Sequence, residues 1–317
     1  MRQWTIQEDK LYDQGIETSR LGKFKETYKS PFLSLNKNKE FIFPFTCTAH
    51  SLGDWGIINR LPECIKKIYP NSKIYIPSPL LIKDIFSFLF SMGQWSNHIK
   101  TPWEVGSIIL KNNPFIDGIY EKGELEGECF TDHYRIYSNK NDDNEPLVEQ
   151  LLRAFGASEN QILEFDSRPK IYLSDKEEEW YKNFKNQHFG NDYGCLLLAS
   201  SRIQLNKQWD FDSNLFPHIE KYKDYPVFYY SSFDISKSSW ATKFKKFISF
   251  EKIGLSFREQ LIVKQKAIFN TGYQAGITDA ISGGGSEIIT LTPYKSIGQN
   301  VIRKTKYIFP NKEIKIY

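Results

Sequence analysis

The sequence predicts an α/β protein made of two Rossmann-like domains, each built around a parallel sheet. Three observations support this fold class. A strand–loop–helix–strand unit, the building block of parallel sheets, spans residues 41–76. The same alternation starts again near Pro169 and continues to Leu291. The chain has 317 residues with 40% hydrophobic and 25% charged side chains, as in globular proteins, and at about 150 residues per domain this length gives two domains.

The first half opens with a polar stretch, residues 1–38, that we interpret as an N-terminal extension. The aromatic run from Phe41 to Cys47 predicts a strand, because such residues favour a pleated surface. Helical spacing of apolar residues follows over 57–68, and Lys73–Ile76 predicts the next strand. The remaining elements predicted here are a helix, three short strands and a second helix, over 82–90, 107–110, 118–120, 128–134 and 146–155.

These elements place the first domain over residues 39–160 and the second over 168–317, with residues 156–168 as the segment between them. The strands predicted for the second domain lie at 169–173, 194–199, 227–230, 267–269 and 287–291. Its predicted helices lie at 175–186, 257–266 and 275–281.

Composition and charge exclude several classes of protein. The excess of 42 Lys and Arg over 38 Asp and Glu gives a net charge of only +4, which makes a nucleic-acid partner unlikely. No apolar run approaches the roughly 20 residues of a transmembrane helix, and residues 1–10 lack the apolar core of a secretory signal. Cysteines at 47, 64, 129 and 195 lack the spacing of a metal site or redox pair. We therefore expect a cytoplasmic protein with free thiols and no bound metal.

Candidate site residues are sought after the strands, because ligands of parallel α/β sheets bind at the carboxyl ends of the strands. Four loops qualify: 50–55, 131–135, 200–209 and 270–276.

Two of these loops belong to the first domain. In loop 50–55, His50 is a candidate ligand contact, Gly53 allows close approach of the backbone, and Asp54 supplies a carboxylate, which alternatively caps the following helix. Loop 131–135 offers the carboxylate, imidazole and guanidinium of Asp132, His133 and Arg135. These suit contact with a polar substrate, with His133 as an alternative general base, or form a polar surface turn.

The other two loops belong to the second domain. Its second predicted strand is followed by hydroxyl and cationic groups at Ser200, Ser201, Arg202 and Lys207. These groups suit a phosphate, or alternatively they form a solvated loop. The segment Asn270-Thr271-Gly272-Tyr273-Gln274 leads from a strand toward a helix, where free backbone N–H groups favour an anion. Ser232, after another strand, is a candidate nucleoside contact.

At several points the chain resembles glycosyltransferase family 9, the lipopolysaccharide heptosyltransferases. The stretch His50-Ser51-Leu52-Gly53-Asp54 through Leu61-Pro62 to Pro70 and Lys73-Ile74-Tyr75-Ile76 is similar to the start of that family. Lys207-Gln208-Trp209 resembles its Lys-x-Trp phosphate loop, Ser256-Phe257-Arg258-Glu259 its Ser-Leu-x-Glu helix start, and Asn270-Thr271-Gly272 its Asp-Thr-Gly donor loop. Thr290-Leu291-Thr292-Pro293 resembles the strand and turn that follow. The matches keep their order from about residue 40 to 295.

The resemblance implies a GT-B fold, with two Rossmann-like domains facing a central cleft, acceptor bound mainly by the first and nucleotide-sugar by the second. It further implies inverting, metal-independent sugar transfer to a glycan or glycolipid, as in lipopolysaccharide or polysaccharide synthesis, with no resident cofactor. Carried over, Asp54 is the catalytic base, Lys207 contacts the donor diphosphate, and Thr271 and Gly272 lie in the donor loop. The chain differs in having Asn270 in place of the family's Asp and no His after Gly272.

Two other functions fit the same two-domain plan. One is a nucleotide-sugar epimerase, which acts on the donor without an acceptor. The other is a non-catalytic nucleotide-sugar binding protein. A further open alternative concerns location: the basic run at 243–247 suits contact with an acceptor or peripheral contact with an anionic membrane surface.

Overall fold

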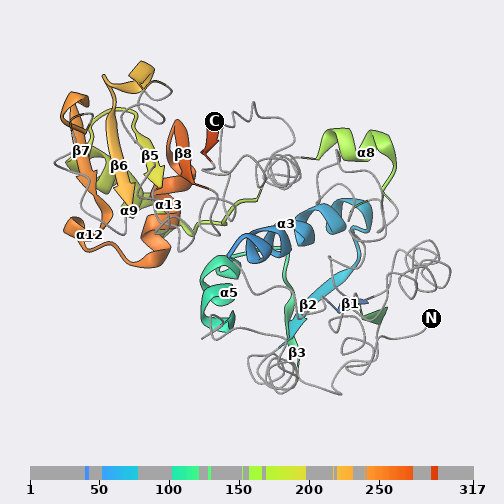
Figure 1. Ribbon diagram of the computed structural model, residues 1–317. Coiled ribbons are helices and arrows are strands. Elements are labelled where there is room, and N and C mark those ends of the chain that lie inside the picture. The colour runs from blue at the N-terminus through green and yellow to red at the C-terminus, as the bar shows by residue number, and fades with distance from the viewer. Residues whose placement is uncertain are drawn as a thin grey trace, which may run out of the picture. The chain divides into compact units, whose positions relative to one another are not determined.

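The computed structural model describes residues 40–42, 52–77, 102–120, 128–129, 152, 157–165, 169–197, 217, 220–230, 239, 241–273 and 287–291. The chain divides into two compact units, Met1–Ser167 and Arg168–Tyr317. Each unit contains its own parallel sheet, as the fold class predicts (Figure 1). The predicted extension over 1–38 and the predicted helices over 82–90 and 275–281 lie outside the described residues.

The first unit alternates strands and helices along the chain. Its elements are β1 (Glu40–Ile42), α3 (Leu52–Ile68), β2 (Lys73–Pro77), α5 (Pro102–Leu110), β3 (Gly118–Tyr120), β4 (Glu128–Cys129) and α8 (Glu159–Glu164). The strands pair in the order β3-β2-β1-β4, and every pair is parallel. Buried residues at helical spacing in α3, among them Leu61 and Ile65, form a core together with Ile74 and Ile76 of β2.

The second unit repeats this architecture with five strands. Its elements are α9 (Asp175–His188), β5 (Gly194–Leu197), η1 (Glu220–Tyr222), β6 (Pro226–Tyr230), η2 (Ala241–Lys243), β7 (Lys246–Ser249), α12 (Phe250–Ile253), α13 (Phe257–Lys266), β8 (Phe269–Tyr273) and β9 (Glu287–Leu291). The strand order is β7-β6-β5-β8-β9, again parallel throughout. Figure 1 shows β6, β5 and β8 side by side in this order.

Aromatic rings fill the core of the second unit. Phe269 stacks on Tyr222 with ring centroids 3.9 Å apart. A Cβ atom at Gly194 would lie 1.8 Å from the Phe269 ring, so no side chain fits there. Phe228 contacts both Phe184 and Phe250 edge to face, with centroids 5.8 and 4.0 Å apart. Aromatic residues of this unit thus pack between the sheet and the helices.

An ion pair joins the start of α9 to α13. Glu177 accepts from the backbone N–H of Ser174 in a capping box at the start of α9. The same carboxylate accepts from Arg258, whose Nε lies 3.0 Å and whose Nη2 lies 3.2 Å from its oxygens. Arg258 also donates to the backbone carbonyl of Tyr172 at 2.5 Å. Because both side chains are nearly buried, at 10% and 14% exposed, this group fixes α13 against α9.

Several elements differ from the sequence prediction. The strand predicted at 107–110 is wrong, because these residues lie in α5, a helix that begins at Pro102, where proline fits the first helical position. No strand forms at 169–173, and part of the predicted linker is the helix α8. Helix α3 begins at Leu52 rather than near Ile57. The strands predicted at 118–120 and 287–291 and the helix predicted at 257–266 are confirmed.

The largest consequence of these differences concerns Asn270. We expected the strand to end at Phe269 and a loop to begin at Asn270, but β8 runs from Phe269 to Tyr273. Asn270 is therefore an interior strand residue that pairs with Cys195 and Ile288 in the ladder. Its side chain is fully buried, and its Nδ2 donates to the backbone carbonyl of Lys264 at 3.1 Å. This contact links the sheet to the end of α13.

We expect Glu177→Gln to destabilise the second unit by roughly 3 kcal/mol, because removing one partner of a buried ion pair leaves the other charge uncompensated. Guanidinium denaturation measures this. The matched control is Glu259→Gln, which removes the same charge from the capping box of α13, where Glu259 accepts from Ser256. Equal losses in both variants would contradict the role given to the ion pair.

We expect Asn270→Ala to lower the melting temperature, because it removes a buried hydrogen bond worth roughly 1 kcal/mol and leaves a cavity. The affinity of the folded variant for nucleoside diphosphates should stay within about twofold of the parent, since the side chain faces the core. Calorimetric titration checks the second point. An unchanged melting temperature combined with a loss of affinity for nucleoside diphosphates would contradict the structural role and support Asn270 as a ligand contact.

Candidate functional site

The candidate site of the first unit lies where its strand order reverses. Strand β1 pairs with β2 on one side and with β4 on the other, and Ile42 is in register with both Tyr75 and Cys129. The chain therefore leaves β1 and β4 side by side at the carboxyl edge of the sheet. Ligands of open α/β sheets bind at such a switch point, because connections leaving in opposite directions open a crevice there.

Helix α3 carries two of the predicted site residues. Gly53 and Asp54 lie in its first turn, since the helix begins at Leu52. The prediction of a loop through Trp55 is therefore wrong for residues 52–55. A first-turn position still suits the predicted chemistry, because the helix dipole stabilises negative charge at the helix N-terminus.

The other residues predicted for this site lie outside the described part of the chain: His50, Asp132, His133 and Arg135. Their sequence positions can be compared with the strand ends. Asp132 follows Cys129, the last residue of β4, by three positions, and His50 precedes the start of α3 by two. They thus belong to the connections that leave β1 and β4.

The second unit has its own switch point, between β5 and β8. Strand β5 pairs with β6 on one side and β8 on the other, and Leu197 is in register with Gly272. Thr271 and Gly272 lie in β8 toward its carboxyl end. The remaining predicted residues lie outside the described part: Ser200, Ser201, Arg202, Lys207, Ser232 and Gln274. Ser200 follows the end of β5 by three positions, and Gln274 directly follows the end of β8.

Two described polar side chains of the strands below this second switch point lie in the core. Cys195 of β5 is fully buried, and burial raises the pKa of its thiol. A protonated thiol is a poor nucleophile. Its ladder partner Asn270 is bonded to the end of α13.

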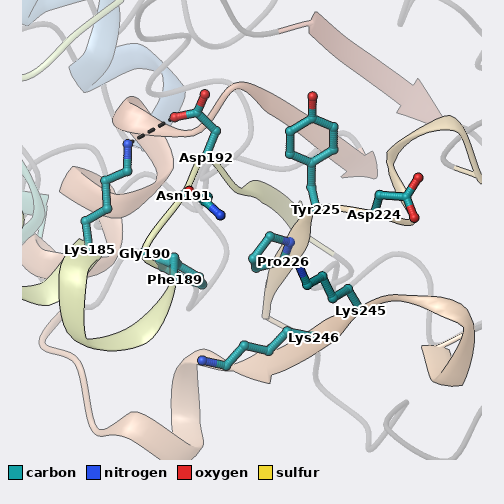
Figure 2. Close-up of a pocket in the computed structure, with 10 residues that line it drawn as sticks. All are labelled: Lys185, Phe189, Gly190, Asn191, Asp192, Asp224, Tyr225, Pro226, Lys245 and Lys246. Carbon is teal, nitrogen blue, oxygen red and sulfur yellow. Dashed lines mark hydrogen bonds and ion pairs between the residues drawn. The ribbon is translucent and has the colours of Figure 1, made fainter.

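A described pocket lies at the opposite edge of the same sheet (Figure 2). Its volume is about 570 Å³. Its lining residues come from the end of α9, from the segments that lead into β5, β6 and β7, and from the first residues of β6 and β7. They are Lys185, Phe189, Gly190, Asn191, Asp192, Asp224, Tyr225, Pro226, Lys245 and Lys246. The sequence analysis did not single out this pocket, because nothing in the sequence indicates which ends of the strands are left hollow.

Two lysines of this pocket bind the protein itself. Lys246 donates to the backbone carbonyl of His188 at the end of α9, where the dipole favours a cation. Lys185 forms an ion pair with Asp192 at 3.0 Å, drawn as a dashed line in Figure 2. Burial, and next the ammonium of Lys246, hold the pKa of His188 below its ordinary value. These contacts give the basic lining a structural explanation.

Among the described residues, no group of three or more His, Cys, Asp or Glu side chains is placed to hold a metal ion. Within the same ranges, none of the helices has both the length and the apolar character needed to cross a membrane.

No protein-family model and no curated protein matches this sequence. Solved structures do match it. The family 9 glycosyl transferase from Veillonella parvula DSM 2008 shares 10% identity over 88% of this chain and 85% of that one, with a TM-score of 0.51. The E. coli ADP-heptose lps heptosyltransferase II shares 9% identity over 88% of this chain and 90% of that one, with a TM-score of 0.48. E. coli heptosyltransferase WaaC with ADP shares 13% identity over 87% of this chain and 93% of that one, with a TM-score of 0.46.

The first of these likenesses agrees with what the two sheets show. Wide coverage of both chains means that both units, and not one alone, take part in the match. The resemblance seen in the sequence is thus confirmed at the level of the fold. This chain has a GT-B-type fold, similar to that of the solved family 9 glycosyl transferase.

Proposed function

We propose that this chain is a glycosyltransferase that moves a sugar from a nucleotide-sugar donor to a hydroxyl group of a glycan or glycolipid. The proposal includes inversion at the anomeric carbon, no metal requirement and Asp54 as general base. Its biological setting is the synthesis of lipopolysaccharide or another polysaccharide.

One observation carries the proposal. Both sheets are parallel, and both reverse their strand order once. Apart from Ser232, the predicted polar residues follow, or lie at the end of, the strands at these two reversals in the sequence. A crevice at a switch point is where open α/β sheets bind ligands. Two such crevices in one chain suit two substrates. The likeness of the whole chain to a family 9 glycosyltransferase supports the same conclusion.

The second unit supplies the donor site. Hydroxyls and cations follow β5 at Ser200, Ser201, Arg202 and Lys207, and the neighbouring strand β8 ends just after Thr271 and Gly272. Cationic side chains form charge-assisted hydrogen bonds with phosphate oxygens. Lys207 and Arg202 thereby stabilise the charge that develops on the departing diphosphate, which is the part a metal ion plays in other transferases. Ser232, which follows β6, contacts the nucleoside.

The first unit supplies the acceptor site and the base. Asp54 lies in the first turn of α3, the helix that follows β1 in the chain, and His50, Asp132 and Arg135 bind the acceptor from the two connections at this edge. A positioned carboxylate that takes the proton of an attacking hydroxyl accelerates such reactions by about 10²–10⁴-fold. His133 is the alternative base.

The reaction is a single displacement. The acceptor oxygen forms a bond to the anomeric carbon while the bond from that carbon to the diphosphate oxygen breaks, and the electron pair leaves with the diphosphate. The acceptor proton passes to the carboxylate of Asp54. Attack on the side opposite the leaving group inverts the anomeric carbon. Holding both substrates in this geometry supplies much of the rate.

We expect one of ADP, UDP, GDP and dTDP to stabilise the protein by about 2.7 kcal/mol at 100 times its Kd, measured by thermal shift. Lys207→Ala should weaken that affinity about 10- to 100-fold, since a hydrogen bond to a charged group is worth roughly 1.5–3 kcal/mol. The matched control is Lys185→Ala, which removes a lysine from the opposite edge of the same sheet. Binding of none of the four, or equal losses in both variants, would contradict the donor site.

We expect Asp54→Asn to lower kcat for transfer from the bound donor by about 10²–10⁴-fold with its affinity unchanged, because only the proton acceptor is lost. Product analysis with a panel of glycan and glycolipid acceptors measures transfer. Glu164→Gln, an exposed carboxylate of α8, is the control.

Three other outcomes would point elsewhere. A larger loss of kcat in His133→Ala than in Asp54→Asn would indicate that the general base is His133, in the connection after β4. Turnover of the donor without any acceptor would indicate the epimerase. Binding without turnover of any kind would indicate a nucleotide-sugar binding protein.

A further inference from the structure

Residues 106–117, called here the bracing segment, run beside α3 from its first turn to its last. Gly106 of α5 faces Trp55, Asn113 bonds to Asn59, and Asp117 pairs with Lys66. The contacted residues of α3 lie four and seven positions apart. At about 100° per residue they fall within about 40° of one another, so the bracing segment follows a single stripe of the helix.

The first contact is the tightest. Trp55 is 2% exposed, and its ring lies directly against the backbone of Gly106. A Cβ atom at position 106 would lie 2.7 Å from three atoms of that ring, a separation that real Cβ atoms essentially never show. The missing side chain of Gly106 is thus the space that the indole occupies. Trp55 directly follows Asp54, so this contact sits next to the proposed base.

The other two contacts fix the helix along its length. Asn113 Nδ2 donates to the backbone carbonyl and to Oδ1 of Asn59, both at 2.8 Å, inside the core. Asp117 Oδ2 lies 2.7 Å from Lys66 Nζ and also accepts from the backbone N–H of Ile74 at 2.6 Å. The bracing segment is therefore bonded to strand β2 as well as to α3.

We infer that Gly106 and the bracing segment are a positioning device, which fixes the first turn of α3 relative to the sheet and thereby sets the place of Asp54. The inference rests on the proposed function, in which Asp54 is the base. Enzymatic rates depend steeply on such placement, since an error of about 1 Å costs about 10²-fold. Buried hydrogen bonds from Asn113 hold the body of the helix at Asn59. In the first turn, the ring of Trp55 fits against Gly106.

The test is the variant Gly106→Ala. We expect kcat for transfer to fall about 10²-fold while KM for the donor, identified by the thermal-shift panel, changes less than about twofold. Trp55→Phe combined with Gly106→Ala should restore kcat to within about tenfold of the parent, because the smaller ring leaves room for the methyl group.

Gly118→Ala is the matched control. Its new Cβ would lie 3.1 Å from the Tyr75 ring, so it crowds the same unit at β3 without touching α3. We expect kcat of this variant to stay within about threefold of the parent. A loss of kcat in Gly118→Ala equal to that in Gly106→Ala, or no rescue by the double variant, would reduce the contact to ordinary packing and overturn the inference.

Hydrogen exchange separates this inference from the proposed function. Gly106→Ala should speed exchange in a peptide spanning residues 52–62, and the double variant should reverse the change. If Asp54→Asn keeps full kcat, the base assignment fails, and the exchange result alone then decides whether the bracing segment fixes the helix. Unchanged exchange in Gly106→Ala overturns the inference whatever Asp54 does.

Discussion

Parallel pairing of strands is the constraint on which the rest of this structure depends. A parallel neighbour requires a crossover connection, so every strand sends its outgoing chain to the same edge of the sheet. When the next strand is added on the other side, two outgoing connections diverge and leave space between them. β1 with β4, and β5 with β8, are the two pairs at which this happens. The position of the two switch points follows from backbone hydrogen bonding between parallel strands.

Local sequence signals predicted the helices and strands whose sequences carry clear capping or β-branched patterns. Helix α13 begins and ends as predicted because Ser256 and Glu259 form a capping box and the helix stops at Lys266. The strand at 287–291 was equally clear from its run of β-branched residues. By contrast, the isoleucines at 108 and 109 indicated a strand, although they belong to a helix that starts at a proline. A short apolar run has no periodicity that tells a strand from a buried helix.

Predicting the candidate sites required information that no local pattern contains. The sequence shows which residue types follow each predicted strand, and their general chemistry follows from that. Which strands are neighbours depends on hydrogen bonds between residues far apart in the sequence, such as Leu197 with Gly272. The difference between the predicted loop position of Asn270 and its place in the core has the same origin, because pairing with strands on both sides extends β8 beyond Phe269. The start of α3 at Leu52 likewise moved Asp54 from a loop into a helical turn.

The contact of Gly194 with the ring of Phe269, which in turn stacks on Tyr222, has a consequence for how such chains diverge. The three positions come from separate elements, yet none can change size alone. A methyl group at 194 becomes tolerable only in a lineage where the ring at 269 has already shrunk, and a smaller residue at 269 leaves a void under Tyr222. The order of substitutions is therefore restricted, and these positions are expected to covary among descendants of this sequence, even where most of the surface drifts freely.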